Sequence, residues 1–168
     1  KGLKEIGCEY RGFLYAGLMI VNNEPFLIEY NVRMGDPECQ TILPKLKTDF
    51  IKLITACVNK NLSSINLEWY DDKSLCIVLC SKGYPEIYKN NIEIKNLKDI
   101  KLNQNEFIFH AGTKKEKNKI LSNGGRVLNF VIRSDSFKNN REKATDLINK
   151  IDWENGFFRK DIGHKVID

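Results

Sequence analysis

The chain has 168 residues, 42% of them hydrophobic, and its 27 basic and 22 acidic side chains give a net charge of +5. This length and composition suffice for one substantial core or two small ones. No apolar run approaches the roughly 20 residues of a membrane-spanning helix, and no secretion signal pattern precedes the first expected strand. These features argue against a membrane or secreted protein, and we expect a cytoplasmic one.

The cysteines and the densest basic stretch carry little functional information. The cysteines are odd in number and lack paired zinc spacing, so neither a disulfide framework nor a zinc knuckle is indicated. The basic stretch from Lys114 to Lys119 is interrupted by an acid and has no interleaved aromatic residues. We therefore expect a solvated hairpin loop there, and no nucleic-acid partner.

The first clear pattern is a pair of strands. Residues 13–20 and 25–32 are expected to form an antiparallel hairpin around a turn at Asn22 and Asn23. Strict alternation in the second strand would place two sets of side chains on opposite faces. One face would carry Phe26, Ile28, Tyr30 and Val32, and the other would carry Leu27, Glu29, Asn31 and Arg33.

The polar face of the second strand suggests a metal–polyphosphate site. Residues two apart on a strand lie roughly 6.6–7 Å from each other on one side. The side chains of Glu29 and Asn31 can therefore converge on one hard cation, which prefers oxygen ligands. Arg33 can reach an anion bound beside that cation. The alternative is a strand whose outer face is simply solvated.

After this strand, a glycine turn leads toward a helix. Asp36 is expected as the N-cap and Pro37 as the first helical residue. Capping this helix could be the whole role of Asp36, and the sequence supports this interpretation as well as it supports a functional role. A second helix is expected after Thr48, its N-cap, because apolar residues recur there at helical spacing.

The remainder of the chain indicates mainly short strands. We expect strands at 75–81, 106–111 and 126–133, and one amphipathic helix at about 137–151. A domain boundary is expected near 62–74, where the sequence is polar. Hairpins and helices in this order favour an α+β fold over a doubly wound parallel sheet.

Glycines near the later strands offer a second candidate site. Gly124 and Gly125 present backbone N–H groups without bulky cover, and Arg126 adds a cation, as in phosphate-binding nests. Glycines in a hairpin turn are, however, more often present because they tolerate positive φ. The tail from Arg159 to His164 could close over a phosphate or merely dock the C-terminus through ion pairs.

Seven blocks in one order make the chain resemble a known family. The blocks are YAGLMI (15–20), IEYNVRMGDPE (28–38), ILPKLKTD (42–49), SKGYP (81–85), FHAGT (109–113), NGGRVL (123–128) and GFFRKDIGH (156–164). Together they closely resemble the C-terminal part of phosphoribosylamine–glycine ligases, also called glycinamide ribonucleotide synthetases. Members of that family are considerably longer, so we expect this chain to be a fragment that works with upstream domains of the same polypeptide.

The resemblance implies a fold and a reaction. Residues 1–62 would be the end of an ATP-grasp lobe, residues 63–74 a connector, and residues 75–168 a small β-rich C-terminal domain. The family joins glycine to 5-phosphoribosylamine in purine biosynthesis through an acyl phosphate, and it cleaves ATP with Mg²⁺ or Mn²⁺. The isolated piece would be inactive.

The resemblance also implies roles for individual residues. Glu29 and Asn31 would hold the metal ion against the ATP phosphates, and Arg33 would contact the transferring phosphoryl group. Asp36 would help to place an amine-bearing substrate. Two alternatives are another ATP-grasp carboxylate–amine ligase, which would share the Glu-x-Asn strand, and a non-catalytic binding module derived from the same fold.

Overall fold

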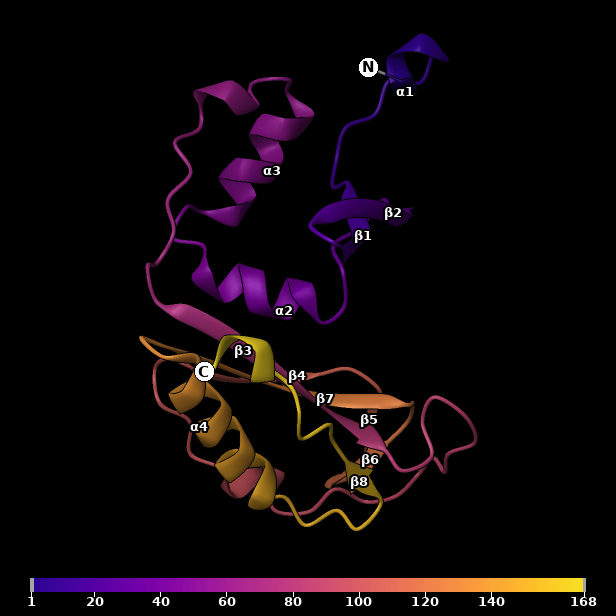
Figure 1. The fold of residues 1–168 in the computed structure, drawn as a ribbon. Helices are drawn as coiled ribbons and strands as arrows, with labels where there is room; N and C mark the ends of the chain where they lie inside the picture. Colours follow the sequence, from indigo (N-terminus) through magenta and orange to yellow (C-terminus); the bar gives the residue numbers. More distant parts are fainter. Residues whose placement is uncertain (1, 168) are drawn as a thin grey trace. The chain divides into compact units, whose positions relative to one another are not determined.

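The computed structural model describes residues 2–167, which form two compact units (Figure 1). The first unit comprises the described residues up to Cys39 together with Leu46–Tyr70. The second comprises Gln40–Lys45 together with the described residues from Asp71 onward. Antiparallel sheets and separate helices make up the structure, which confirms the predicted α+β class. Within residues 2–167, no helix has the length and apolarity needed to cross a membrane.

The first unit is built around the predicted hairpin. Strands β1 (Tyr15–Val21) and β2 (Glu24–Asn31) pair in antiparallel fashion. Asn22 and Asn23, which join them, have φ angles of 52° and 65°. A two-residue turn with positive φ at both positions matches the twist of the flanking strands, and asparagine tolerates that conformation well. The predicted turn is therefore confirmed.

The hairpin contains an irregularity that the sequence pattern did not predict. Gly17 pairs with Glu29, but the neighbouring Leu18 pairs with Leu27, so Ile28 is an extra residue in β2. Paired residues share a face, and neighbouring residues of β1 lie on opposite faces. Leu27 therefore lies on the face opposite Glu29, and the prediction that they share a face is wrong. An extra residue in one strand reverses the face that strict alternation assigns to every side chain on one side of it.

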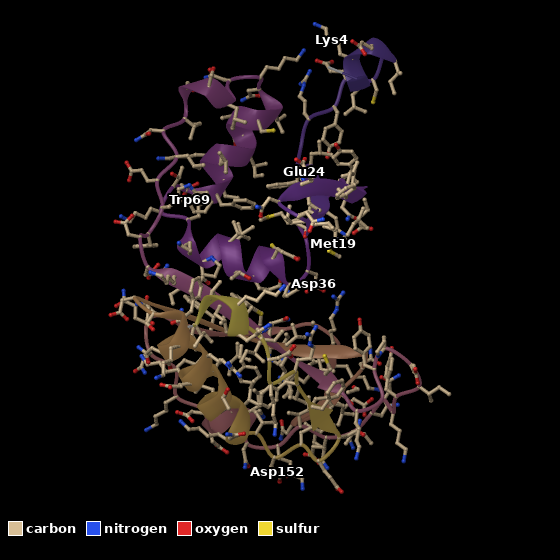
Figure 2. The ribbon with its side chains drawn as sticks, in the orientation of Figure 1. Lys4, Met19, Glu24, Asp36, Trp69 and Asp152 are labelled. Carbon is tan, nitrogen blue, oxygen red and sulfur yellow. The ribbon has the colours of Figure 1, made fainter. Side chains whose placement is uncertain are left out.

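Both strands of this hairpin expose large apolar side chains (Figure 2). Eight of these side chains are between 47% and 63% exposed: Leu18, Met19, Ile20, Val21, Phe26, Leu27, Ile28 and Tyr30. Soluble proteins rarely expose a contiguous apolar patch of this kind unless another surface covers it. The two-stranded sheet therefore has faces that the described residues leave open.

Helix α3 (Phe50–Val58) of the first unit begins one residue later than predicted. Asp49 is its N-cap, because the Asp49 carboxylate accepts the N–H of Lys52 at 2.8 Å. Thr48, the predicted cap, instead accepts the N–H of Glu68 at 2.7 Å. The hydroxyl is thus committed to a distant segment, which sequence spacing could not reveal. The other helical turns of this unit are α1 (Gly2–Glu5) and η2 (Leu62–Ser64).

The second unit is a four-stranded antiparallel sheet with one helix against it (Figure 1). The strand order is β4-β7-β3-β8. Helix α4 packs on β3 and β7, and its N-cap Ser136 accepts the N–H of Asn139. The elements are β3 (Lys73–Ser81), β4 (Glu106–His110), β7 (Arg126–Ser134), α4 (Phe137–Asn149) and β8 (Gly156–Phe157).

The core of the second unit lies between this sheet and α4. Leu75, Ile77 and Leu79 alternate along β3 and are buried, as are Phe130 and Ile132 of β7. One face of α4 completes the core with Ala144, Leu147 and Ile148. The period of two in the strand and the helical spacing in α4 both follow from burial on a single face.

A second hairpin carries the lysine-rich stretch. Strands β5 (Thr113–Glu116) and β6 (Lys119–Ser122) pair in antiparallel fashion, and Lys114 forms an ion pair with Glu116 at 2.7 Å. The side chains from position 115 to 119 are exposed, which confirms the predicted solvated hairpin. The remaining short elements are α2 (Glu38–Ile42), η1 (Leu43–Lys45), η3 (Leu97–Asp99) and η4 (His164–Val166).

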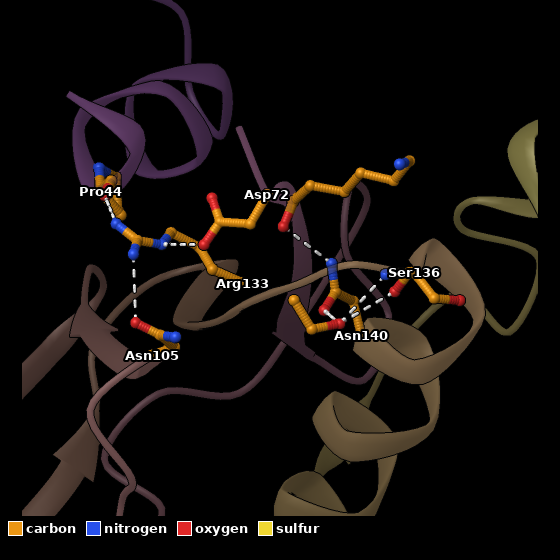
Figure 3. A network of polar contacts seen from close by, with 8 residues as sticks. Pro44, Asp72, Asn105, Arg133, Ser136 and Asn140 are labelled. Carbon is orange, nitrogen blue, oxygen red and sulfur yellow. Dashed lines mark hydrogen bonds and ion pairs between the residues drawn. The ribbon is translucent and has the colours of Figure 1, made fainter. Parts of the chain in front are cut away.

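Near the C-terminal end of β7, a buried arginine ties several segments of the second unit together (Figure 3). Arg133 donates from Nε to Asp72 Oδ2 and from Nη2 to Asn105 Oδ1, both at 3.1 Å. It also donates to the carbonyl of Pro44. A guanidinium presents five N–H donors in a planar fork, so one side chain serves three acceptors.

Candidate metal and phosphate site

The structure brings the two predicted metal ligands together. Glu29 and Asn31 lie two residues apart near the end of β2, and Asn31 Nδ2 donates to Glu29 Oε1 at 2.8 Å. Both side chains therefore point to one place beside the strand. The terminal torsion of an asparagine side chain is broad, so its rotation would direct the amide oxygen toward the same place.

The residues around Glu29 leave room for an ion. Gly17 pairs with Glu29, and a Cβ atom at Gly17 would lie 3.1 Å from Glu29 Cγ. The missing side chain thus gives the carboxylate space. One carboxylate and one carboxamide oxygen are hard ligands, and this donor set fits a Mg²⁺ ion that keeps water and phosphate oxygens as its other ligands. Within residues 2–167, no group of three or more His, Cys, Asp or Glu side chains could hold a metal.

Tyr15 is a site neighbour that the sequence reasoning missed. It pairs with Asn31 across the ladder, so it shares the face of the two ligands. Its hydroxyl donates to Glu38 Oε1 at 3.1 Å. This hydrogen bond to Glu38 is the main reason why the pKa of the Tyr15 phenol is raised. The sequence alone offered no signal for this neighbour, because regular pairing outward from the Asn22-Asn23 turn would set Tyr15 opposite Tyr30. Only the extra residue at Ile28 sets Tyr15 opposite Asn31.

Arg33 lies outside the strand. Strand β2 ends at Asn31, and the Arg33 guanidinium is exposed and donates from Nη1 to the carbonyl of Met34 at 2.9 Å. The prediction that Arg33 extends the polar face by regular alternation is therefore wrong, because the chain bends before it reaches this residue. The contact of Arg33 with a phosphoryl group stays a prediction.

Asp36 occupies a turn between β2 and α2 (Figure 2). Helix α2 begins at Glu38, so Pro37 is not the first helical residue, and Asp36 lies two positions before the helix. The turn is closed by the N–H of Cys39, which donates to the carbonyl of Gly35 at 2.9 Å. Asp36 is exposed there. The role of Asp36 in placing a substrate stays a prediction.

The glycines of the second candidate site are present for close packing. Neither Gly124 nor Gly125 has a positive φ, so the alternating geometry of a nest is absent at this pair. Their carbonyls accept hydrogen bonds from Ser81, both at 2.8 Å. A Cβ at Gly112 would lie 2.8 Å from the Cα of Gly124. Phosphate binding by Gly124, Gly125 and the exposed Arg126 stays a prediction, and it would have to use another geometry.

The two histidines and the C-terminal tail make local contacts. His110 Nδ1 lies 2.9 Å from Thr113 Oγ1, and His164 Nδ1 lies 2.7 Å from the carbonyl oxygen of Asp161. Arg159 donates to both carboxylate oxygens of Asp161, at 3.0 and 2.6 Å. This hydrogen bonding from Arg159 lowers the pKa of Asp161. This ion pair lies within the tail itself, so both roles considered for the tail stay predictions.

Comparison with known families gives a match in each unit of the chain. The C domain of phosphoribosylglycinamide synthetase matches residues 74–165, and the ATP-grasp (A) domain of the same synthetase matches residues 1–39. The paired side chains of Glu29 and Asn31 therefore lie in the ATP-grasp match. The chain belongs to the phosphoribosylglycinamide synthetase family.

Individual relatives agree with this assignment. Phosphoribosylamine–glycine ligase from Caldanaerobacter subterraneus is 46% identical over 95% of the chain, and the trifunctional purine biosynthetic protein adenosine-3 from Gallus gallus is 40% identical over 99% of it. The crystal structure of phosphoribosylamine–glycine ligase from Thermotoga maritima superposes with a TM-score of 0.80 at 32% identity over 96% of the chain. The chain spans 38%, 17% and 39%, respectively, of the lengths of these proteins.

Proposed function

We propose that the chain is the C-terminal part of an ATP-dependent ligase that joins glycine to 5-phosphoribosylamine in purine biosynthesis. The observation that carries this proposal is the contact between Glu29 and Asn31, at 2.8 Å, inside the segment matched to the ATP-grasp domain. The names of the relatives and the share of their length that the chain covers support it.

The proposal assigns successive segments of the polypeptide to different domains. Residues 1–62 would end the ATP-grasp lobe, residues 63–74 would connect it, and residues 75–168 would form the C-terminal domain. The family matches at 1–39 and 74–165 support this division. Upstream domains of the same polypeptide would supply the rest of the site. A cytoplasmic location stays a prediction, because one plant relative is chloroplastic.

The reaction would proceed in two balanced steps. A glycine carboxylate oxygen attacks the γ-phosphorus of ATP, and the bond to the β–γ bridging oxygen breaks, so that ADP leaves. The amine of phosphoribosylamine then attacks the acyl carbon, and phosphate leaves as the amide forms and a proton is lost. The first step brings two anions together, so charge neutralisation is the central task of the site.

The proposed residue roles follow from this task. Glu29 and Asn31 would hold Mg²⁺ or Mn²⁺, which would neutralise charge on the ATP phosphates. Arg33, exposed beside them in the chain, would contact the transferring phosphoryl group. Asp36 would place the amine-bearing substrate. In the C-terminal domain, we propose phosphate contacts from Gly124, Gly125 and Arg126.

The test is a product assay on the full open reading frame that contains residues 1–168. Radiolabelled glycine, ATP, Mg²⁺ and phosphoribosylamine generated in situ should give a labelled amide and ADP in equal amounts. A labelled product with another amine, and none with phosphoribosylamine, would favour a different ATP-grasp ligase. Binding of ATP with Mg²⁺ but without turnover of any amine would favour a non-catalytic module.

A further inference from the structure

One hydrogen bond links the strand opposite the metal ligands to the helix that follows the Asp36 turn. Tyr15, the first residue of β1, shares a face with Asn31, and its hydroxyl reaches Glu38 Oε1 at 3.1 Å. Glu38 is the first residue of α2. The phenol therefore bridges the hairpin that carries Glu29 and Asn31 and the far side of the turn.

The turn itself is packed beneath this bridge. Gly35 is buried, and a Cβ at this position would lie 2.9 Å from Glu38 Cδ and 3.1 Å from Tyr15 Cε2. A side chain at this position would displace the Glu38 carboxylate from its present place beside Tyr15. The carbonyl of Gly35 also accepts the N–H of Cys39, which closes the turn around Asp36. Gly35, which lies beside the Tyr15–Glu38 bridge, thus accepts the hydrogen bond that holds the backbone of the turn.

We propose that Tyr15 is a positioning residue that fixes the Asp36 turn relative to the Glu29–Asn31 pair through its hydrogen bond to Glu38. This inference rests on the proposed function. Misplacing a group by about 1 Å can lower a rate by on the order of 10². The loss should fall on kcat rather than on the KM for ATP, because Tyr15 acts through the turn.

The experiment compares Tyr15→Phe with Tyr30→Phe in the full open reading frame. Tyr15→Phe keeps the ring over Gly35 but removes the hydroxyl. Tyr30 pairs with Ala16 and so lies on the opposite face of the hairpin, which makes it a matched control. We expect kcat to fall by on the order of 10² in Tyr15→Phe and to stay near the wild-type value in Tyr30→Phe.

Two variants of Glu38 test whether loss of the Tyr15–Glu38 hydrogen bond causes the fall in kcat. Glu38→Gln keeps an acceptor oxygen for the phenol and should retain most of the activity, whereas Glu38→Ala should resemble Tyr15→Phe. The double variant Tyr15→Phe/Glu38→Ala should be no worse than either single variant, because both remove the same interaction. Full additivity of the two losses would overturn the proposal.

A readout without substrates separates this inference from the proposed function. Hydrogen exchange of the backbone amides in residues 34–39 should accelerate in Tyr15→Phe and not in Tyr30→Phe. Unchanged exchange would overturn the positioning role, even if kcat fell. Faster exchange with an unchanged kcat would also overturn it. If the wild-type protein made no amide, the proposed function would fail, and the catalytic part of this inference with it, while exchange would still decide whether Tyr15 orders the turn.

Discussion

Arg133 Nε donates to Asp72 Oδ2 at 3.1 Å, and this ion pair is largely buried in the second unit, with Arg133 only 8% exposed (Figure 3). The second carboxylate oxygen of Asp72 is buried and has no hydrogen-bond partner. The negative charge of Asp72 is therefore balanced by its ion pair with Arg133. A buried carboxylate that loses its cation is costly, because it keeps its desolvation penalty and loses the attraction.

We predict that Arg133→Met lowers the free energy of unfolding by roughly 3 kcal/mol, the lower end for breaking a buried ion pair. For a chain of this size, the melting temperature should fall by roughly 6–12 °C. Thermal unfolding followed by circular dichroism measures the change. The control is Arg159→Met, which removes an exposed pair with Asp161 and should leave the melting temperature unchanged. Equal melting temperatures for Arg133→Met and Arg159→Met would contradict a stabilising role for the Arg133–Asp72 ion pair.

Gly17→Ala should weaken metal binding without unfolding the hairpin. The added Cβ would lie 3.1 Å from Glu29 Cγ, so the Glu29 side chain would have to move by a few tenths of an ångström from its present position. We expect about a tenfold loss of Mn²⁺ affinity in the presence of ATP, at the low end for disturbed ligand positioning. Electron paramagnetic resonance of Mn²⁺ in the full open reading frame measures it. Gly2→Ala is the control, because nothing lies within 4 Å of its added Cβ. Equal affinities in the two variants would show that Gly17 has no such role.

Arg33→Ala should lower kcat more than it raises the KM for ATP. The proposed contact strengthens as charge moves during phosphoryl transfer, and such contacts act mainly on kcat. Steady-state kinetics with the full open reading frame distinguishes the two effects. A variant that melts early, while its folded fraction is fully active, would instead make Arg33 a structural residue.

The chain expressed as residues 1–168 alone should show no glycine-dependent ADP release, and it should self-associate. It spans only 38% of the Caldanaerobacter relative, and its hairpin exposes a contiguous set of apolar side chains. Met19 and Phe26 pair across the strands, so Met19→Glu with Phe26→Lys should raise the monomer fraction in sedimentation. Turnover by a soluble monomeric wild-type chain would contradict the view that upstream sequence supplies part of the site.

Local sequence signals predicted much of the fold. Asn22-Asn23 specified the hairpin turn, because both residues tolerate positive φ. The apolar run in residues 75–81 and the helical spacing in residues 137–151 located a core strand and the helix packed on it. The predicted convergence of Glu29 and Asn31 also followed from their spacing of two in a strand.

The features that sequence reasoning missed depend on contacts between distant residues. The extra residue at Ile28 shows only in the register with β1, and it reversed the face assigned to Leu27. Thr48 lost its capping role to Asp49 because its hydroxyl binds Glu68, twenty residues away. Gly124 and Gly125 were assigned either to a phosphate nest or to positive φ, whereas close packing accounts for them: a Cβ at Gly124 would lie 3.1 Å from Gly112 Cα, and a Cβ at Gly125 would clash with the Tyr84 ring.

The central claim is that Glu29 and Asn31 hold the metal ion of an ATP-grasp ligase, and Glu29→Gln tests it most directly. The variant keeps the shape of the side chain and removes its charge. The measurement is glycine-dependent ADP release by the full open reading frame as Mg²⁺ is varied, with Glu24→Gln on the same strand as the control. We predict a rate loss of on the order of 10²–10³ for Glu29→Gln, a higher Mg²⁺ requirement, and a normal response for Glu24→Gln. Near-normal turnover of Glu29→Gln at limiting Mg²⁺ would contradict the claim.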